Sequence, residues 1–136
     1  MQVWRCLAGA LFLLIAIRAG VARAEPPSNP KSALVAELQQ AVRADDKAWL
    51  AAHLHYPVRY YGRKNELIRS KAWFDKHYAM VIGRELKAAV LAQDPEDFFE
   101  NWQGIMVGEG SRNIWLRNFG ADTEPKYEIV TINNSD

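Results

Sequence analysis

The sequence predicts an α+β fold, in which N-terminal helices pack on a strongly curved antiparallel sheet. The hydrophobic residues repeat with a period near 3.6 between residues 32 and 93, and with a period of 2 between residues 98 and 133. Helices followed by strands are typical of domains whose helices cover one face of an antiparallel sheet. Both faces of the predicted strands are largely apolar. A sheet with one wet face would alternate more cleanly, so we expect the second face to cover a pocket or a partner chain.

The first 24 residues have the pattern of a cleaved signal peptide. Arg5 precedes an apolar run at residues 6–17, which is too short to span a membrane as a helix. Ala22 and Ala24 supply the small residues of a cleavage site. We therefore expect cleavage near Ala24 and a periplasmic or secreted protein. The single cysteine, Cys6, would leave with the leader, so the mature chain would have no disulfide.

Cleavage changes the net charge of the chain. The full sequence has 17 basic and 16 acidic residues, and the leader contains three arginines and no acidic residue. The mature chain of 112 residues would thus have 14 basic and 16 acidic residues, for a net charge of −2. This balance argues against a nucleic-acid partner, which favours a dominant basic face. The mature length suits one domain, and no later apolar run is long enough for a membrane span.

Two helices are predicted at the start of the mature chain. Residues 25–31 are polar and rich in proline, which indicates a flexible linker before a single domain at residues 32–136. Ser32 is the expected N-cap of the first helix, and Asp46 is the expected N-cap of a second helix that ends near residue 54.

A short strand and two further helices follow. Pro57 is expected to end the second helix, and residues 58–61 alternate as a strand that places Arg59 and Tyr61 on one face. A polar turn then leads to a third helix capped by Ser70. Gly83 should separate this helix from a fourth.

Three strands close the predicted domain. They are residues 98–108, 114–119 and 126–133, with turns at residues 109–111 and 120–125. A continuous first strand would place Phe98, Trp102 and Met106 on one face and Phe99 on the other.

Five short motifs appear in an order that resembles a known superfamily. They are D-x-x-x-L at residues 46–50, Y-P-V at 56–58, F-x-x-x-Y at 74–78, W-Q-G-I-M-V-G-x-G at 102–110 and I-V-T-I-N at 129–133. Together they resemble the nuclear transport factor 2-like superfamily of cystatin-like α+β cones, in a small exported bacterial-type form. The resemblance implies helices wrapped by a bent sheet around an internal pocket. This superfamily includes isomerases, dehydratases, transport factors and binding proteins, so the fold does not fix the function.

The main functional hypothesis is an exported, non-enzymatic binding domain. Within the implied cone, six aromatic or apolar residues are expected to line the pocket, with Arg59 at its rim. The six are Tyr61, Phe74, Tyr78, Trp102, Met106 and Trp115. The occupant would be a small apolar molecule in the cone or a protein on the sheet face. That protein could be the target of an inhibitor or immunity function, or a second copy of the chain, because the superfamily often pairs through its sheet.

The alternative hypothesis is a small isomerase or lyase. The superfamily's isomerase and dehydratase branches use a pocket carboxylate, tyrosines or a histidine, and Tyr61, His77 and Glu100 are the matching residue types here. An inward-facing Glu100 beside apolar side chains would have a raised pKa, as a general base requires. No motif specific to either branch is present.

The remaining chemical motifs are weak. His53 and His55 resemble a metal-binding pair, but a helix end followed by a turn should make their side chains diverge, so no metal and no cofactor is expected. Residues 63–76 are basic and residues 94–100 are acidic, which indicates either solvated faces or an electrostatic rim for a ligand.

Overall fold

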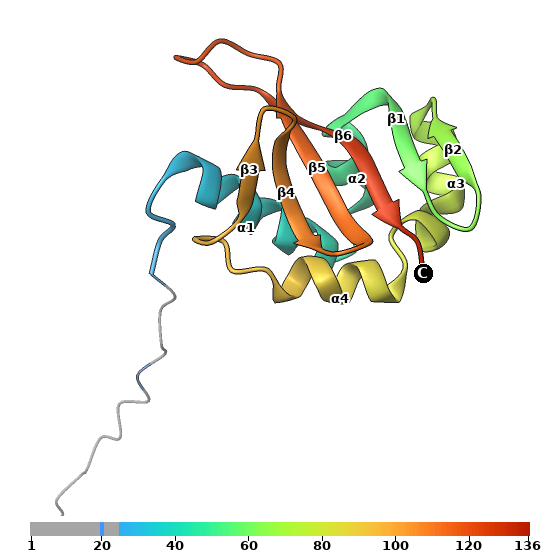
Figure 1. Cartoon of the computed structure of the whole chain (residues 1–136), viewed down its shortest axis with the longest axis horizontal. Helices are drawn as coiled ribbons and strands as arrows, with labels where there is room; N and C mark the ends of the chain where they lie inside the picture. The colour runs from blue at the N-terminus through green and yellow to red at the C-terminus, as the bar shows by residue number, and fades with distance from the viewer. Residues whose placement is uncertain (1–19, 21–24) are drawn as a thin grey trace, which may run out of the picture.

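The computed structural model describes residue 20 and residues 25–136, and Figure 1 shows their arrangement. The predicted cleavage site near Ala24 lies outside the described residues, as does nearly all of the predicted signal peptide. None of the helices in the described part of the chain combines the length and the apolar character that a membrane crossing needs.

The described residues form four helices and six strands, which confirms the α+β class. The helices are α1 (Pro30–Arg43), α2 (Lys47–Ala52), α3 (Lys71–Val81) and α4 (Arg84–Ala92). The strands are β1 (Leu54–Tyr61), β2 (Asn65–Ile68), β3 (Phe99–Asn101), β4 (Gly104–Glu109), β5 (Arg112–Asn118) and β6 (Tyr127–Asn134).

The six strands form one mixed sheet in the order β2-β1-β6-β5-β4-β3. Every neighbouring pair is antiparallel except β1 and β6, which run parallel, so the prediction of a purely antiparallel sheet was wrong at this pair. A parallel pair needs a long crossover connection, and the chain between residues 61 and 127 supplies one. The sheet has two free edges, β2 and β3, and does not close into a barrel.

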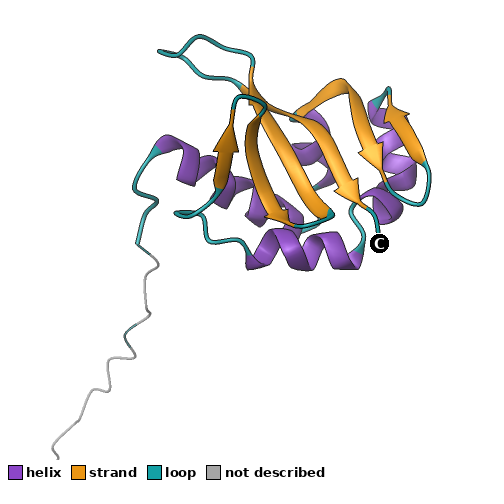
Figure 2. Cartoon of the chain, viewed as in Figure 1, coloured by secondary structure: helices purple, strands orange, loops and turns teal. Residues whose placement is uncertain are grey.

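The helices all lie on one face of the sheet, as Figures 1 and 2 show. We call this covered side the inner face. Its strand residues are fully buried against the helices, and they include Ile105, Ile114, Leu116, Ile129 and Ile132. Phe74 from α3 and Leu86 and Val90 from α4 belong to the same core, together with buried residues of α1 and α2. None of the described helices covers the opposite side, which we call the outer face.

Side-chain caps fix three of the helix starts. Asn29, not the predicted Ser32, caps α1: its side chain accepts hydrogen bonds from the backbone N–H groups of Lys31 and Ser32 at 2.9 Å. Ser32 is buried instead, and its hydroxyl donates to Glu96 at 3.0 Å. The helix therefore begins inside the predicted linker. The predicted caps of α2 and α3, Asp46 and Ser70, are confirmed.

The connection between α2 and β1 is tighter than predicted. The helix ends at Ala52, and the strand begins at Leu54, four residues before the predicted start. Pro57 does not end the helix but lies within β1, where the register with β6 is irregular between Leu54 and Arg59. Proline has no N–H group to donate, so such an irregularity is one of the places where a strand tolerates it.

The predicted strand at residues 98–108 is a hairpin. The Asn101 side chain accepts a hydrogen bond from Gln103 N at 2.8 Å and closes the turn between β3 and β4. Gly104 has φ = 133°, and a Cβ atom there would lie 2.0 Å from the Leu116 carbonyl oxygen. The reversal places Phe99 opposite Met106 on the same face, which corrects the predicted separation of these two residues.

Candidate functional site

One row of side chains crosses the outer face through all six strands. The strand registers align Phe99, Met106, Trp115, Thr131, Arg59 and Leu67, in order from β3 to β2. Directly opposite residues in neighbouring strands have Cβ atoms about 5 Å apart, so these side chains touch their neighbours. We call this set the outer row.

The outer row is apolar at both ends and open to solvent. Phe99 is 53% exposed and Leu67 is 42% exposed, and Tyr61 beside the row is 38% exposed. Phe99 packs edge-to-face on Trp115, with ring centroids 6.2 Å apart. Large apolar side chains that gather on one face, rather than lying singly, are typical of an interaction surface.

Charged groups of both signs accompany the outer row. Glu128 accepts a hydrogen bond from His55 Nδ1 at 2.6 Å and lies 3.3 Å from the Lys126 ammonium. The hydrogen bond from His55 is the main reason that the pKa of the Glu128 carboxyl is lowered. His55 also stacks on Phe119 with ring centroids 3.8 Å apart. Arg59 adds a positive charge within the row itself.

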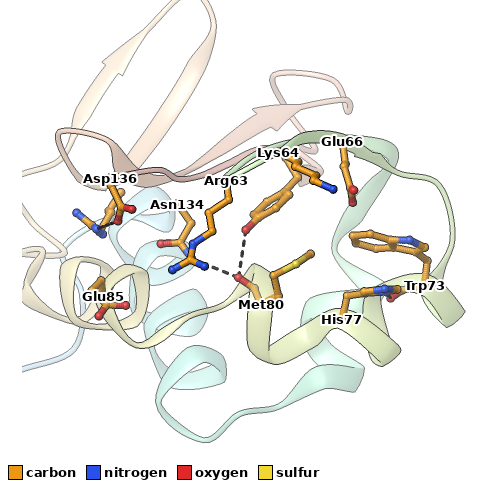
Figure 3. A pocket seen from close by; sticks show the side chains of 11 residues that line it. Arg63, Lys64, Glu66, Trp73, His77, Met80, Glu85, Asn134 and Asp136 are labelled. Carbon is orange, nitrogen blue, oxygen red and sulfur yellow. Dashed lines mark hydrogen bonds and ion pairs between the residues drawn. The ribbon is translucent and has the colours of Figure 1, made fainter.

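A cleft of about 580 Å³ lies at the other side of the molecule, between the β1–β2 hairpin and α3 (Figure 3). Trp73 and His77 form one wall of this cleft, and their rings stack 4.0 Å apart at 20°. His77 Nδ1 lies 2.8 Å from the Trp73 carbonyl oxygen. Because a carbonyl oxygen only accepts, Nδ1 carries a proton, and Nε2 is an acceptor in the neutral ring.

The floor of the cleft is polar. Tyr60 and Asn134 both donate hydrogen bonds to the Met80 carbonyl oxygen, at 3.2 Å and 3.3 Å. Burial and the nearby Glu66 raise the pKa of the Tyr60 phenol. Gly62 leaves space for this tyrosine, because a Cβ atom at residue 62 would lie 2.3 Å from its hydroxyl oxygen.

The charged groups around the cleft are only partly paired. Arg112 and Asp136 form an ion pair at 3.0 Å, and Glu85 pairs with Arg84 at 3.4 Å. Arg63, Lys64 and Glu66 line the same cleft. Within residues 25–136, neither Arg63 nor Lys64 has an acidic group within ion-pair distance. The lining thus has three basic and three acidic side chains, and two of the basic ones, Arg63 and Lys64, have no ion-pair partner among the described residues.

The six predicted ligand-binding residues do not surround one cavity. Phe74 and Tyr78 are buried under the inner face, where the Tyr78 hydroxyl donates to Asp45 at 2.8 Å and burial raises the pKa of this phenol. Trp102 lies at the β3–β4 turn and is 87% exposed. The other three, Tyr61, Met106 and Trp115, lie on the outer face.

The three residues of the catalytic alternative are also apart. Tyr61 is on β1 at the outer face, and His77 lines the cleft from α3. Glu100 is on the edge strand β3 and pairs with Lys31 at 2.6 Å. Four strand spacings separate β1 from β3, about 19 Å. Arg59 does share a face with Tyr61 as predicted, but this is the open outer face, where the two residues line only a shallow hollow of about 260 Å³.

The histidine pair diverges as predicted. His53 bonds to the Trp49 carbonyl oxygen at 2.7 Å, whereas His55 bonds to Glu128. Among the described residues, no group of three or more potential ligands is arranged to hold a metal ion.

Sequence reasoning missed residues at both surfaces. Leu67 belongs to β2, a strand that was not predicted, and Phe99 was assigned to the wrong face. The basic residues Arg63 and Lys64 did give a signal, since the positive run that contains them was considered as a ligand rim.

Comparison with known proteins adds no relative: no protein-family model, no curated protein and no solved structure matches this chain. The resemblance to the nuclear transport factor 2-like superfamily therefore stays a prediction.

Proposed function

We propose that the protein is an exported, non-enzymatic binding domain whose outer sheet face pairs with a second copy of the chain. The observation that supports this proposal is the outer row, which spans all six strands, is apolar at both ends and is covered by none of the described helices. The predicted catalytic residues are apart, so the described residues offer a surface rather than an assembled reaction centre.

The size of the outer face suits a protein partner. Six strands at a spacing of about 4.8 Å, with an average length of about 20 Å, give a projected area of roughly 580 Å². The exposed side chain of Phe119, which stacks on His55, extends the face beyond the end of β5. The resulting area approaches the surface of about 800 Å² that each partner buries in a protein interface of standard size.

The charge pattern favours a second copy as that partner. A two-fold interface uses the same patch on both subunits, so the patch must match itself. The outer face combines positive Arg59 and Arg117 with negative Glu128. A patch with both signs can place unlike charges opposite each other, whereas a patch of one sign would repel its copy.

Self-association of the purified protein tests this proposal. We expect a dimer in sedimentation experiments at micromolar concentration, and we expect Phe99→Lys and Met106→Lys to shift it to monomer. A lysine ammonium desolvated without a partner opposes association. Met80→Lys is the matched control, because Met80 is 46% exposed but lies on α3, on the helix side.

Three outcomes would contradict the proposal. They are a wild-type protein that stays monomeric up to about 100 μM, a dimer that survives both outer-row variants, and a dimer that Met80→Lys disrupts equally. If the protein is a monomer that binds a different protein through Phe99, the outer face is a binding surface, but its partner is not a second copy of the chain. Export is tested separately, since N-terminal sequencing of the exported product should begin at Glu25.

A further inference from the structure

We propose that the cleft between the β1–β2 hairpin and α3 binds a planar aromatic carboxylate. The cleft lies on the helix side of the sheet and shares no residue with the outer row, so this inference does not rest on the proposed dimer. Its volume, about 580 Å³, is in the range of small-molecule sites, which is roughly 300–1,000 Å³.

The aromatic wall favours a flat ligand. Trp73 and His77 present stacked, nearly parallel rings, and the hydrogen bond from His77 to the helix backbone holds this orientation. Met80 lies next to them in Figure 3, and its side chain is 46% exposed. A rigid aromatic wall beside a flexible thioether can enclose an aromatic ring, through stacking on one side and a sulfur–aromatic contact on the other.

The charges favour a single negative group on the ligand. The pairs Arg112–Asp136 and Arg84–Glu85 neutralise themselves. Arg63 and Lys64 line the same cleft, and neither has an acidic group within ion-pair distance among residues 25–136, so both cations are available to an anionic ligand. The lining as a whole has three basic and three acidic side chains, so a singly charged carboxylate disturbs this balance less than a phosphate dianion would.

The polar residues of the cleft divide into a hydrogen-bonded floor and groups that are available to a ligand. Tyr60 and Asn134 both donate to the Met80 carbonyl oxygen, and these hydrogen bonds hold the floor in position. Arg112 also lines the cleft, but its guanidinium is already paired with Asp136 at 3.0 Å. The two oxygens of a carboxylate can instead accept from the unpaired guanidinium of Arg63 and the unpaired ammonium of Lys64.

Calorimetric titration of the purified protein with 1-naphthoate tests the inference, with 1-naphthamide as the uncharged analogue. We expect saturable binding of the carboxylate and at least about tenfold weaker binding of the amide, since charge-assisted hydrogen bonds are the stronger kind. The double variant Arg63→Gln/Lys64→Gln should weaken naphthoate binding by a similar factor, as should Trp73→Leu.

Matched variants separate this site from general surface effects. Lys76 is an exposed residue of α3 that does not line the cleft. Lys76→Gln should therefore leave the affinity for naphthoate unchanged. Phe99→Lys disrupts the outer row and should also leave it unchanged, so failure of the dimer and failure of this site are distinguishable. Absence of naphthoate binding up to about 5 mM, equal binding of the amide, or equal loss in Lys76→Gln would overturn the inference.

Discussion

The two faces of the sheet are built from alternate residues of the same strands, yet they have different surroundings. Leu116 is fully buried under the helices, whereas its neighbour Trp115 lies in the outer row. Successive strand residues point to opposite faces, so one residue of sequence separates a core position from an open one. An apolar outer row is not needed to bury the core, which implies that it has another role.

The largest contrast should come from truncating these two neighbours. Leu116→Ala leaves a cavity among fully buried residues and should lower the free energy of unfolding by about 2–5 kcal/mol. Trp115→Ala removes a larger side chain from the open face and should cost the monomer only about 1–2 kcal/mol. Urea denaturation at low protein concentration measures both.

The same pair also tests the dimer. If Trp115 is covered by a second copy, the stability of the wild type should rise with protein concentration, and Trp115→Ala should remove that rise. Equal losses for the two variants at low concentration would mean that the outer face is as well packed as the inner one, which would break the comparison.

Strain within the outer face should give an intermediate effect. Gly108 faces Asn113 with φ = 116°, and a Cβ atom there would lie 2.4 Å from the Arg112 carbonyl oxygen. Gly108→Ala should therefore cost about 1–3 kcal/mol of unfolding free energy.

Gly110→Ala is the control for that substitution. Gly110 also has a positive φ, 57°, but its Cβ position is in open space, so only the backbone cost of about 1 kcal/mol should remain. Thermal unfolding compares the two variants. A Gly110→Ala loss equal to that of Gly108→Ala would show that the close approach of β4 and β5 contributes nothing.

Local features of the fold could be predicted from the sequence, and long-range ones could not. Asp46 and Ser70 were identified as caps because a cap depends on residues within one helical turn. The parallel pairing of β1 with β6 joins segments about seventy residues apart, and no local pattern encodes it.

The candidate sites show the same division. The β3–β4 turn does have local signals, Asn101 and Gly104. The surrounding apolar residues, however, also fit one continuous strand. A reversal of the chain changes which face of the sheet each preceding residue points to, so missing the turn misplaces Phe99. The cleft unites residues from the β1–β2 hairpin, α3, α4 and the end of β6. Its aromatic and basic components were visible in the sequence, but their proximity follows only from the assembled sheet.

The smallest expected effect concerns charge on the outer face. The hydrogen bond from His55, with help from Lys126, lowers the pKa of Glu128 below its ordinary value near 4.5. The folded state thus binds this proton less readily than the unfolded chain, so the stabilisation is present above the ordinary pKa and disappears as the pH falls through the folded one. Glu128→Gln should cost about 1 kcal/mol or less near pH 7, and the loss should shrink as the pH falls below the ordinary pKa, in urea unfolding curves of the monomer. Glu124→Gln is the control, because Glu124 lies in an exposed turn with no ion pair among the described residues, and it should leave the stability unchanged over this pH range. A Glu128→Gln loss that is independent of pH would mean that this residue supports the outer face through packing rather than through its charge.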